Sequence, residues 1–168
     1  MTQTMRPGRY LLWLAFAGLL LVLDLWTKHL ASQNLELFRP LVVTSWLNLT
    51  LAHNEGAAFS LLAGAGGWQR WFFTAVALIV SGVLLVWLKR LPNSARLLPV
   101  AITMVLAGAL GNMIDRIRLG YVVDFIDVHY GGWHWPAFNL ADSVIVLGVI
   151  LLLLEGFIPR RVHLQTRP

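Results

Sequence analysis

The sequence predicts an all-α membrane protein with a small β part, built on four transmembrane helices. Three observations indicate this class. Of the 168 residues, 58% are hydrophobic and only 12% are charged, a balance that soluble domains of this length rarely show. Four apolar segments are long enough to cross a bilayer, which takes roughly 20 residues each. The basic residues cluster just outside these segments. We expect a single membrane domain over residues 1–168.

The four predicted spans lie at about residues 10–30, 71–88, 97–114 and 140–157. The first contains Asp24 and Lys28 near its far end, whereas the second and third carry no charge. No small-residue cleavage site follows the apolar core of the first span, so we expect a retained anchor rather than a cleaved signal peptide. The chain has no cysteine, which excludes disulfides, thiolate metal sites and cysteine nucleophiles.

Basic residues outside the spans predict the orientation of the chain. The N-terminal tail carries Arg6 and Arg9, the short loop between the second and third spans carries Lys89, Arg90 and Arg96, and the C-terminal tail carries Arg160, Arg161 and Arg167. By the positive-inside rule these segments are cytoplasmic, so both termini lie inside and the longer loops, about 31–70 and 115–139, lie outside. Topology therefore explains the pI of about 10.5 better than nucleic-acid binding does.

The first outer loop has the pattern of folded structure. Between residues 47 and 51, leucines alternate with polar residues, which predicts a half-buried strand that residues 41–43 could pair with. A turn is expected over residues 53–56 and a short helix over residues 57–63. An interfacial belt of tryptophans is expected at Trp46, Trp68, Trp71, Trp133 and Trp135.

Two aspartates are the main candidates for catalysis. Asp124 follows two valines, and Asp142 begins the fourth apolar run, so both belong at the outer membrane boundary. Ionisable residues at such a depth are costly and usually have a task. Two neighbouring carboxylates share a proton, so that one acts as base towards water while the other polarises a peptide carbonyl. Taken singly, Asp142 could instead cap a helix that starts at Asn139, and Asp124 could be a solvated loop carboxylate.

Two further pairs of polar residues lie four positions apart near the outer ends of spans. Asn112 and Arg116 share a helix face and could hold substrate backbone or orient a catalytic acid. An interfacial arginine with a helix cap explains them equally well. Asp24 and Lys28 are predicted to form a structural ion pair.

A metal site is an alternative that the composition leaves open. Its candidate ligands are Asp127, His129 and His134, together with Asp124 and Asp142. Their spacing matches no metal motif, so we expect no metal and no other cofactor. Besides a metal-dependent membrane hydrolase, a non-enzymatic scaffold or small transporter remains possible. A transporter would carry charges along a path through the bilayer, whereas here they gather at one face.

Four ordered segments closely resemble bacterial lipoprotein signal peptidase (signal peptidase II). They are Asn-Glu-Gly-Ala-Ala-Phe-Ser at 54–60, Gly-Ala-Leu-Gly-Asn-Met-Ile-Asp-Arg at 108–116, Val-Val-Asp-Phe at 122–125 and Phe-Asn-Leu-Ala-Asp-Ser at 138–143. Asp24 and Lys28 match as well. The resemblance covers the chain from the first span to the end of the fourth.

This resemblance implies an aspartyl endopeptidase of the bacterial inner membrane, which cuts a prolipoprotein just before a cysteine that carries diacylglycerol. It implies Asp124 and Asp142 as the catalytic dyad at the periplasmic face. The residues implied to line or support the site are Asn54, Gly56, Asn112, Arg116, Asn139, Ala141, Asp24 and Lys28. The implied fold has four membrane helices, a periplasmic β-cradle and a short interfacial helix. The implied partners are prolipoproteins and membrane lipid, not nucleic acid.

Overall fold

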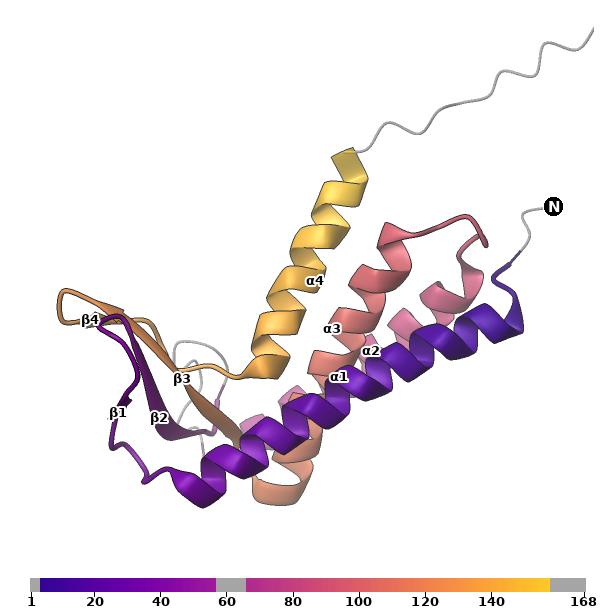
Figure 1. The fold of residues 1–168 in the computed structure, drawn as a ribbon. Helices are drawn as coiled ribbons and strands as arrows, with labels where there is room; N and C mark the ends of the chain where they lie inside the picture. Colours follow the sequence, from indigo (N-terminus) through magenta and orange to yellow (C-terminus); the bar gives the residue numbers. More distant parts are fainter. Residues whose placement is uncertain (1–3, 57–65, 158–168) are drawn as a thin grey trace, which may run out of the picture.

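The computed structural model describes residues 4–56 and 66–157, which contain four long helices and one antiparallel sheet (Figure 1). The helices are α1 (Pro7–Asn34), α2 (Trp68–Arg90), α3 (Leu97–Leu119) and α4 (Leu140–Phe157). The strands are β1 (Leu41–Val42), β2 (Leu47–Asn54), β3 (Val122–Tyr130) and β4 (Trp133–His134). The short helix expected over residues 57–63 lies outside the described residues.

Each of the four helices is long and apolar enough to cross a membrane, which confirms the four predicted spans as helices. In α3, 56% of the most apolar window is buried, against 11–17% in the other helices, so α3 is the centre of the bundle. This helix also continues past the predicted end of its span, to Leu119. That residues 1–168 form a single domain stays a prediction.

Two glycines on α3 allow neighbouring helices to approach its backbone closely. A Cβ atom on Gly108 would collide with the main-chain oxygen of Ala141 on α4. A Cβ atom on Gly111 would collide with the carboxylate of Asp24 on α1. These positions therefore bring the first and last spans against the same stretch of α3, where the polar residues of the bundle gather.

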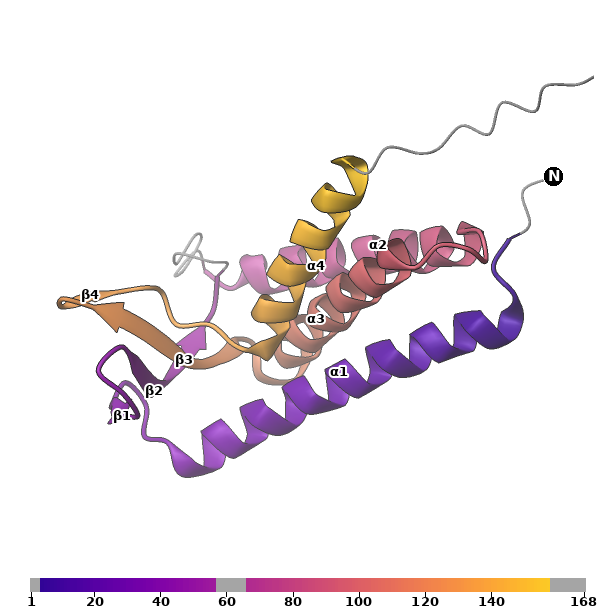
Figure 2. The same ribbon diagram turned by 45° about the horizontal axis from the view of Figure 1, so that its top comes forward.

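The sheet has the strand order β1-β2-β3-β4 and extends beyond one end of the bundle (Figure 2). The predicted pairing of residues 41–43 with β2 is confirmed for Leu41 and Val42. Strands β3 and β4 were not predicted from the pattern of residues 115–139, which was assigned as a loop. The turn expected over residues 53–56 was wrong in its first half, because His53 and Asn54 continue β2.

The predicted alternation along β2 holds only in part, since the buried residues are Asn48 and Leu51. The register of β2 against β3 shifts between Leu49 and Ala52, and such a bulge moves the following side chains to the other face. After the bulge, Ala52 pairs with Asp124. The bulge therefore helps to determine which strand residues reach the catalytic candidates.

Contacts at the opposite end of the bundle tie the N-terminal segment to the connection between α2 and α3. The main-chain N–H of Arg6 donates to Asn93 Oδ1 at 3.1 Å, and Arg9 Nη2 donates to the main-chain oxygen of Ala95 at 2.5 Å. The C-terminal end of α4 lies at this same end in both views (Figures 1 and 2). These helix ends thus share one side of the bundle, although the cytoplasmic assignment of that side stays a prediction.

Candidate active site

The N-terminus of α4 is built by a reciprocal pair of hydrogen bonds. The side-chain oxygen of Asn139 accepts from the main-chain N–H of Asp142 at 2.9 Å, and the Asp142 carboxylate accepts from the main-chain N–H of Asn139 at 3.2 Å. This is a capping box, so the capping interpretation of Asp142 is correct. Capping uses only Oδ2 of Asp142, and Oδ1 points to α3.

Asn139 also connects the helix start to Asp124. Its side-chain Nδ2 donates to Asp124 Oδ1 at 2.7 Å, and Asn54 Nδ2 from β2 donates to the other oxygen, Oδ2, at 3.0 Å. Asp124 is only 2% exposed, so it is not the solvated loop carboxylate that was considered from the sequence. One fully buried asparagine therefore bonds to both candidate aspartates.

Asn112 bonds from α3 to both Asp142 and Asn139. Its Nδ2 donates to Asp142 Oδ1 at 2.7 Å, and its Oδ1 accepts from Lys28 Nζ at 2.9 Å and from Asn139 Nδ2 at 3.2 Å. The orientation of this amide is fixed because an ammonium can only donate. Lys28 therefore sets the direction in which Asn112 presents its N–H to Asp142.

The ion pair predicted between Asp24 and Lys28 is confirmed, with 2.9 Å between Oδ2 and Nζ. Both residues are buried, and the pair does more than close a helix turn. Asp24 Oδ1 accepts the main-chain N–H of Ala141 at 2.8 Å, which ties α1 to the residue directly before Asp142. Ala141 thus contributes its backbone to the site, while its side chain packs near Gly111.

Arg116 and Gly56 meet at the rim of the site. Arg116 Nη2 donates to the main-chain oxygen of Gly56 at 2.9 Å, and Nη1 donates to that of Asn112 at 3.3 Å. The N–H of Gly56 donates in turn to Asn54 Oδ1 at 3.0 Å. The arginine is therefore more than the interfacial or capping residue considered from the sequence. It holds the backbone of Gly56, which closely follows β2.

Asp115 is a buried site residue that sequence reasoning missed. Its Oδ2 atom is 3.0 Å from Lys28 Nζ, and the residue is only 5% exposed. The same oxygen accepts the main-chain N–H of Val123 at 3.2 Å. It belongs to the segment 108–116, but nothing in the local spacing shows that Lys28 on α1 is its partner.

Both aspartates line one cavity of about 970 Å³ at the junction of the sheet and the bundle. Its polar wall includes Asn54, Asn112, Arg116, Asp124 and Asp142. Its apolar wall includes Phe38, Trp135, Pro136, Phe138, Ile145, Val146 and Leu147. The cavity thus places two carboxylates, which can accept and donate protons, beside an apolar surface that can bind a hydrocarbon chain.

The pKa of Asp124 is raised from its ordinary value of 3.8 to about 7. Burial is the largest cause, since it penalises the charged form, and the nearby charge of Asp142 adds to it. Hydrogen bonds from Asn54 and Asn139 act in the opposite direction but do not cancel the rise. A carboxyl group that keeps its proton near neutral pH can act as an acid.

The alternative metal site is not assembled in the part of the chain that the structure describes. No group of three or more His, Cys, Asp or Glu side chains there could hold a metal ion. Asp127 instead accepts hydrogen bonds from Asn48, Thr50 and His134, the last at 2.7 Å. Burial alone would raise the pKa of Asp127, but these bonds outweigh it and lower that pKa.

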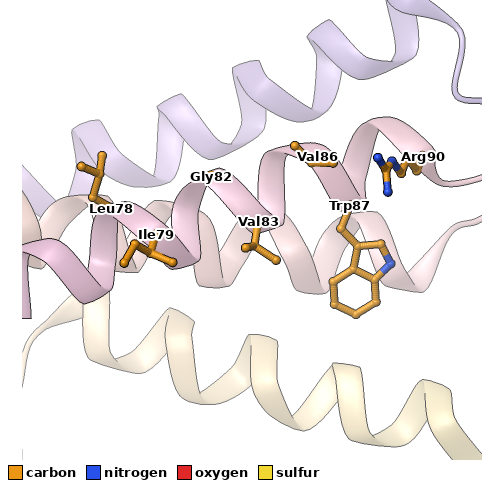
Figure 3. A pocket seen from close by; sticks show the side chains of 7 residues that line it. All are labelled: Leu78, Ile79, Gly82, Val83, Val86, Trp87 and Arg90. Atoms are coloured by element: carbon orange, nitrogen blue, oxygen red, sulfur yellow. The ribbon is translucent and has the colours of Figure 1, made fainter.

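A second pocket, of about 560 Å³, lies along one face of α2 (Figure 3). Its lining comes from α2 alone: Leu78, Ile79, Gly82, Val83, Val86, Trp87 and Arg90. Arg90 at the end of the helix is its only charged residue, and the rest are apolar. This pocket therefore offers no acid or base for hydrolysis.

Comparisons with known proteins agree on one family. The profile described as signal peptidase (SPase) II matches residues 16–158. A lipoprotein signal peptidase of Acinetobacter baumannii is 57% identical over 147 residues, which are 88% of this chain and 84% of the relative. One of Ectopseudomonas mendocina is 52% identical over 159 residues, 94% of each chain. A solved bacterial membrane enzyme, 31% identical, superposes with a TM-score of 0.79 over 96% of this chain and 99% of that one.

Proposed function

The chain belongs to the signal peptidase II family of aspartic peptidases, and we propose that it removes the signal peptide from prolipoproteins with Asp124 and Asp142 as its catalytic pair. One observation carries the proposal: both carboxylates line the same cavity and both are hydrogen-bonded to Asn139. Membership of this family also decides against the scaffold and transporter alternatives, since its members are peptidases.

In the proposed mechanism the two aspartates have different tasks. Asp142 lies in the first turn of α4 and receives N–H donors from Asn112 and Asn139, an environment that suits a carboxylate. It takes a proton from a water molecule, whose oxygen attacks the carbonyl carbon of the scissile bond. Asp124, with its pKa near 7, gives its proton to the carbonyl oxygen. When the C–N bond of the tetrahedral intermediate breaks, the proton on Asp142 passes to the leaving nitrogen, and one hydroxyl of the intermediate returns its proton to Asp124.

The substrate must present an extended segment to this pair. A transmembrane signal helix hides its peptide bonds in internal hydrogen bonds, so it has to unwind before it can be cut. Asn54 and Arg116 line the cavity next to the aspartates, and we assign to them the task of holding the unwound backbone. Gly56 supports them through its carbonyl contact with Arg116.

The apolar wall supports a lipid-modified substrate. Val146 and Leu147 line the cavity and are 57% and 52% exposed, so α4 continues from the cavity to the lipid-facing surface. We assign this wall to the acyl chains of a diacylglyceryl cysteine, which would hold the adjacent peptide bond at the depth of the aspartates. Each buried methylene contributes about 0.8 kcal/mol, so two acyl chains anchor the substrate firmly.

The chain is a multi-pass membrane protein, and we propose the bacterial inner membrane as its location. Both termini would be cytoplasmic, and the cavity would open at the periplasmic face. The basic residues adjoining one end of the bundle support this orientation. The aspartates belong to the opposite end, where the sheet lies (Figure 1).

Replacement of each aspartate by asparagine tests the proposed function. Asparagine keeps the size of the side chain but cannot serve as base or hold the shared proton. Purified Asp124→Asn and Asp142→Asn proteins should insert and unfold cooperatively in detergent micelles, yet cleave a lipid-modified prolipoprotein at a rate near background. Near-normal cleavage by both variants would overturn the proposal.

A further inference from the structure

Lys28 lies between two buried carboxylates that the mechanism above does not use. Its ammonium is 2.9 Å from Asp24 Oδ2, 3.0 Å from Asp115 Oδ2 and 2.9 Å from Asn112 Oδ1. An ammonium has three donors, so every donor of Lys28 has an acceptor. Such full satisfaction, at 2% exposure, fixes the position of the charge within the bundle.

The two carboxylates make matching contacts with the backbone. Asp24 accepts the main-chain N–H of Ala141, the residue directly before Asp142. Asp115 accepts the main-chain N–H of Val123, the residue directly before Asp124. Each carboxylate therefore holds the peptide group that precedes one of the two catalytic candidates, and Lys28 joins the two carboxylates.

We propose that Asp115 is a positioning residue which, with Lys28 and Asp24, sets the separation between Asp124 and Asp142. The inference rests on the proposed function, because it gives Asp115 a task only if these aspartates react. One oxygen of Asp115 bridges the ammonium from α1 and the start of β3, so moving it shifts the strand relative to the helices. A displacement of about 1 Å at a reacting group can cost on the order of a hundredfold in rate.

The charges around Asp115 predict a second effect. They are Lys28 and Asp24 from α1, Arg116 from α3, Asp124 from β3 and Asp142 from α4. The ammonium of Lys28 already lowers the pKa of Asp124 somewhat, against the larger effect of burial. Removing the charge of Asp115 leaves that ammonium less neutralised, so the pH–rate profile should move to lower pH.

Three variants in purified, detergent-solubilised enzyme test the inference. Asp115→Asn should lower kcat by on the order of tenfold or more with little change in KM, and it should move the pH–rate profile to lower pH. Asp115→Glu keeps the charge but displaces the oxygen, so it should lower kcat while leaving the pH profile in place. Leu106→Ala, a buried substitution on α3 away from the cavity, is the control for lost stability alone.

The outcomes separate this inference from the proposed function. If Asp115→Asn loses no more activity than Leu106→Ala at a comparable melting temperature, with an unchanged pH profile, Asp115 is merely structural. If Asp115→Asn does not fold, Asp115→Glu decides, and a normal kcat in that variant overturns the inference. An inactive Asp124→Asn enzyme beside a normal Asp115→Asn enzyme defeats only the inference, whereas an active Asp124→Asn enzyme defeats the proposed function.

Discussion

Asn139 and Asp142 exchange two hydrogen bonds across the first turn of α4, and the Asn139 side chain that caps the helix also reaches Asp124. Helix capping and alignment of the proposed catalytic pair are therefore combined in one residue. The two tasks use different atoms: Oδ1 caps the helix and Nδ2 bonds to Asp124. Substitutions can separate them.

Serine at position 139 should keep the cap but lose the bond to Asp124, because serine is a good N-cap residue with a shorter side chain. We expect Asn139→Ser to melt close to the wild type and to lose most of its kcat. Asn139→Ala should lose about 1 kcal/mol of stability as well as activity. Thermal melts and cleavage rates on the same preparations check this. Full activity of the serine variant would show that the contact with Asp124 has no catalytic role.

The raised pKa of Asp124 predicts how stability depends on pH. Since this pKa is about 7 in the folded protein and ordinarily 3.8, its contribution to stability is full below pH 3.8 and is lost as pH rises through 7. The difference in unfolding free energy between the wild type and Asp124→Asn should therefore fall between pH 4 and pH 7. Melts of both proteins across this range measure it, and parallel curves would contradict it.

The pH dependence of cleavage follows from the same group. Above pH 7 Asp124 loses the proton that the mechanism requires, so kcat/KM should decline on the alkaline side. Initial rates with one prolipoprotein from pH 5 to pH 9 give the profile. A rate that stays constant up to pH 9 would argue against an acid at this position.

A side chain added at Gly111 should disturb the charged cluster of Asp24, Lys28 and Asp115. Gly111→Ala places a methyl group against the Asp24 carboxylate, so it should lower the melting temperature and the activity together. Gly82→Ala is the matched control, because a Cβ atom there meets nothing within 4 Å, and alanine favours a helix by up to about 1 kcal/mol. The two variants should therefore shift the melting temperature in opposite directions, and equal shifts would refute the packing argument.

Independence from metal is expected because Asp127 and His134 bond to each other, and no group of three or more His, Cys, Asp or Glu side chains among the described residues could hold a metal ion. Cleavage in detergent should survive excess chelator, and the double variant His129→Ala with His134→Ala should remain active. Activity that disappears with chelator and returns with zinc would favour a metalloenzyme.

Selectivity for lipid is expected from the apolar wall of the cavity. A precursor whose cysteine carries diacylglycerol should be cut far faster than the same precursor with a free cysteine, because the acyl chains hold the scissile bond at the cavity. The comparison uses purified enzyme in matched micelles. Equal rates for the two precursors would show that the lipid plays no part in substrate recognition.

The sequence was sufficient for features that depend on local composition. The four spans could be predicted because each is a continuous apolar run, and Asp124 and Asp142 stood out because charge is rare at such positions. The Asp24–Lys28 pair could be predicted from its spacing of four residues. In each case the evidence lies within one segment.

Features that depend on distant partners were missed or assigned only in part. Strand β3 is rich in β-branched residues, but its partner β2 is about 70 positions away in the sequence, and the two spans between them hide the pairing. The role of Asp115 becomes evident only from its ion pair with Lys28, which lies on another helix. The turn assigned to residues 53–56 failed because pairing of Asn54 with Val122 overrides the local preference of asparagine and glycine for turns.

The contact between Asp24 and the backbone of Ala141 joins the first helix to the fourth, which has a consequence for biosynthesis. When α1 enters the membrane, α3 and α4 have not been synthesised, so Asp24 and Lys28 have only each other as partners. Their spacing of four residues lets them neutralise one another during that interval. Asn112, Asp115 and Ala141 join them later, as the ribosome delivers the remaining helices. A nascent chain therefore carries no assembled protease until its last helix is in place.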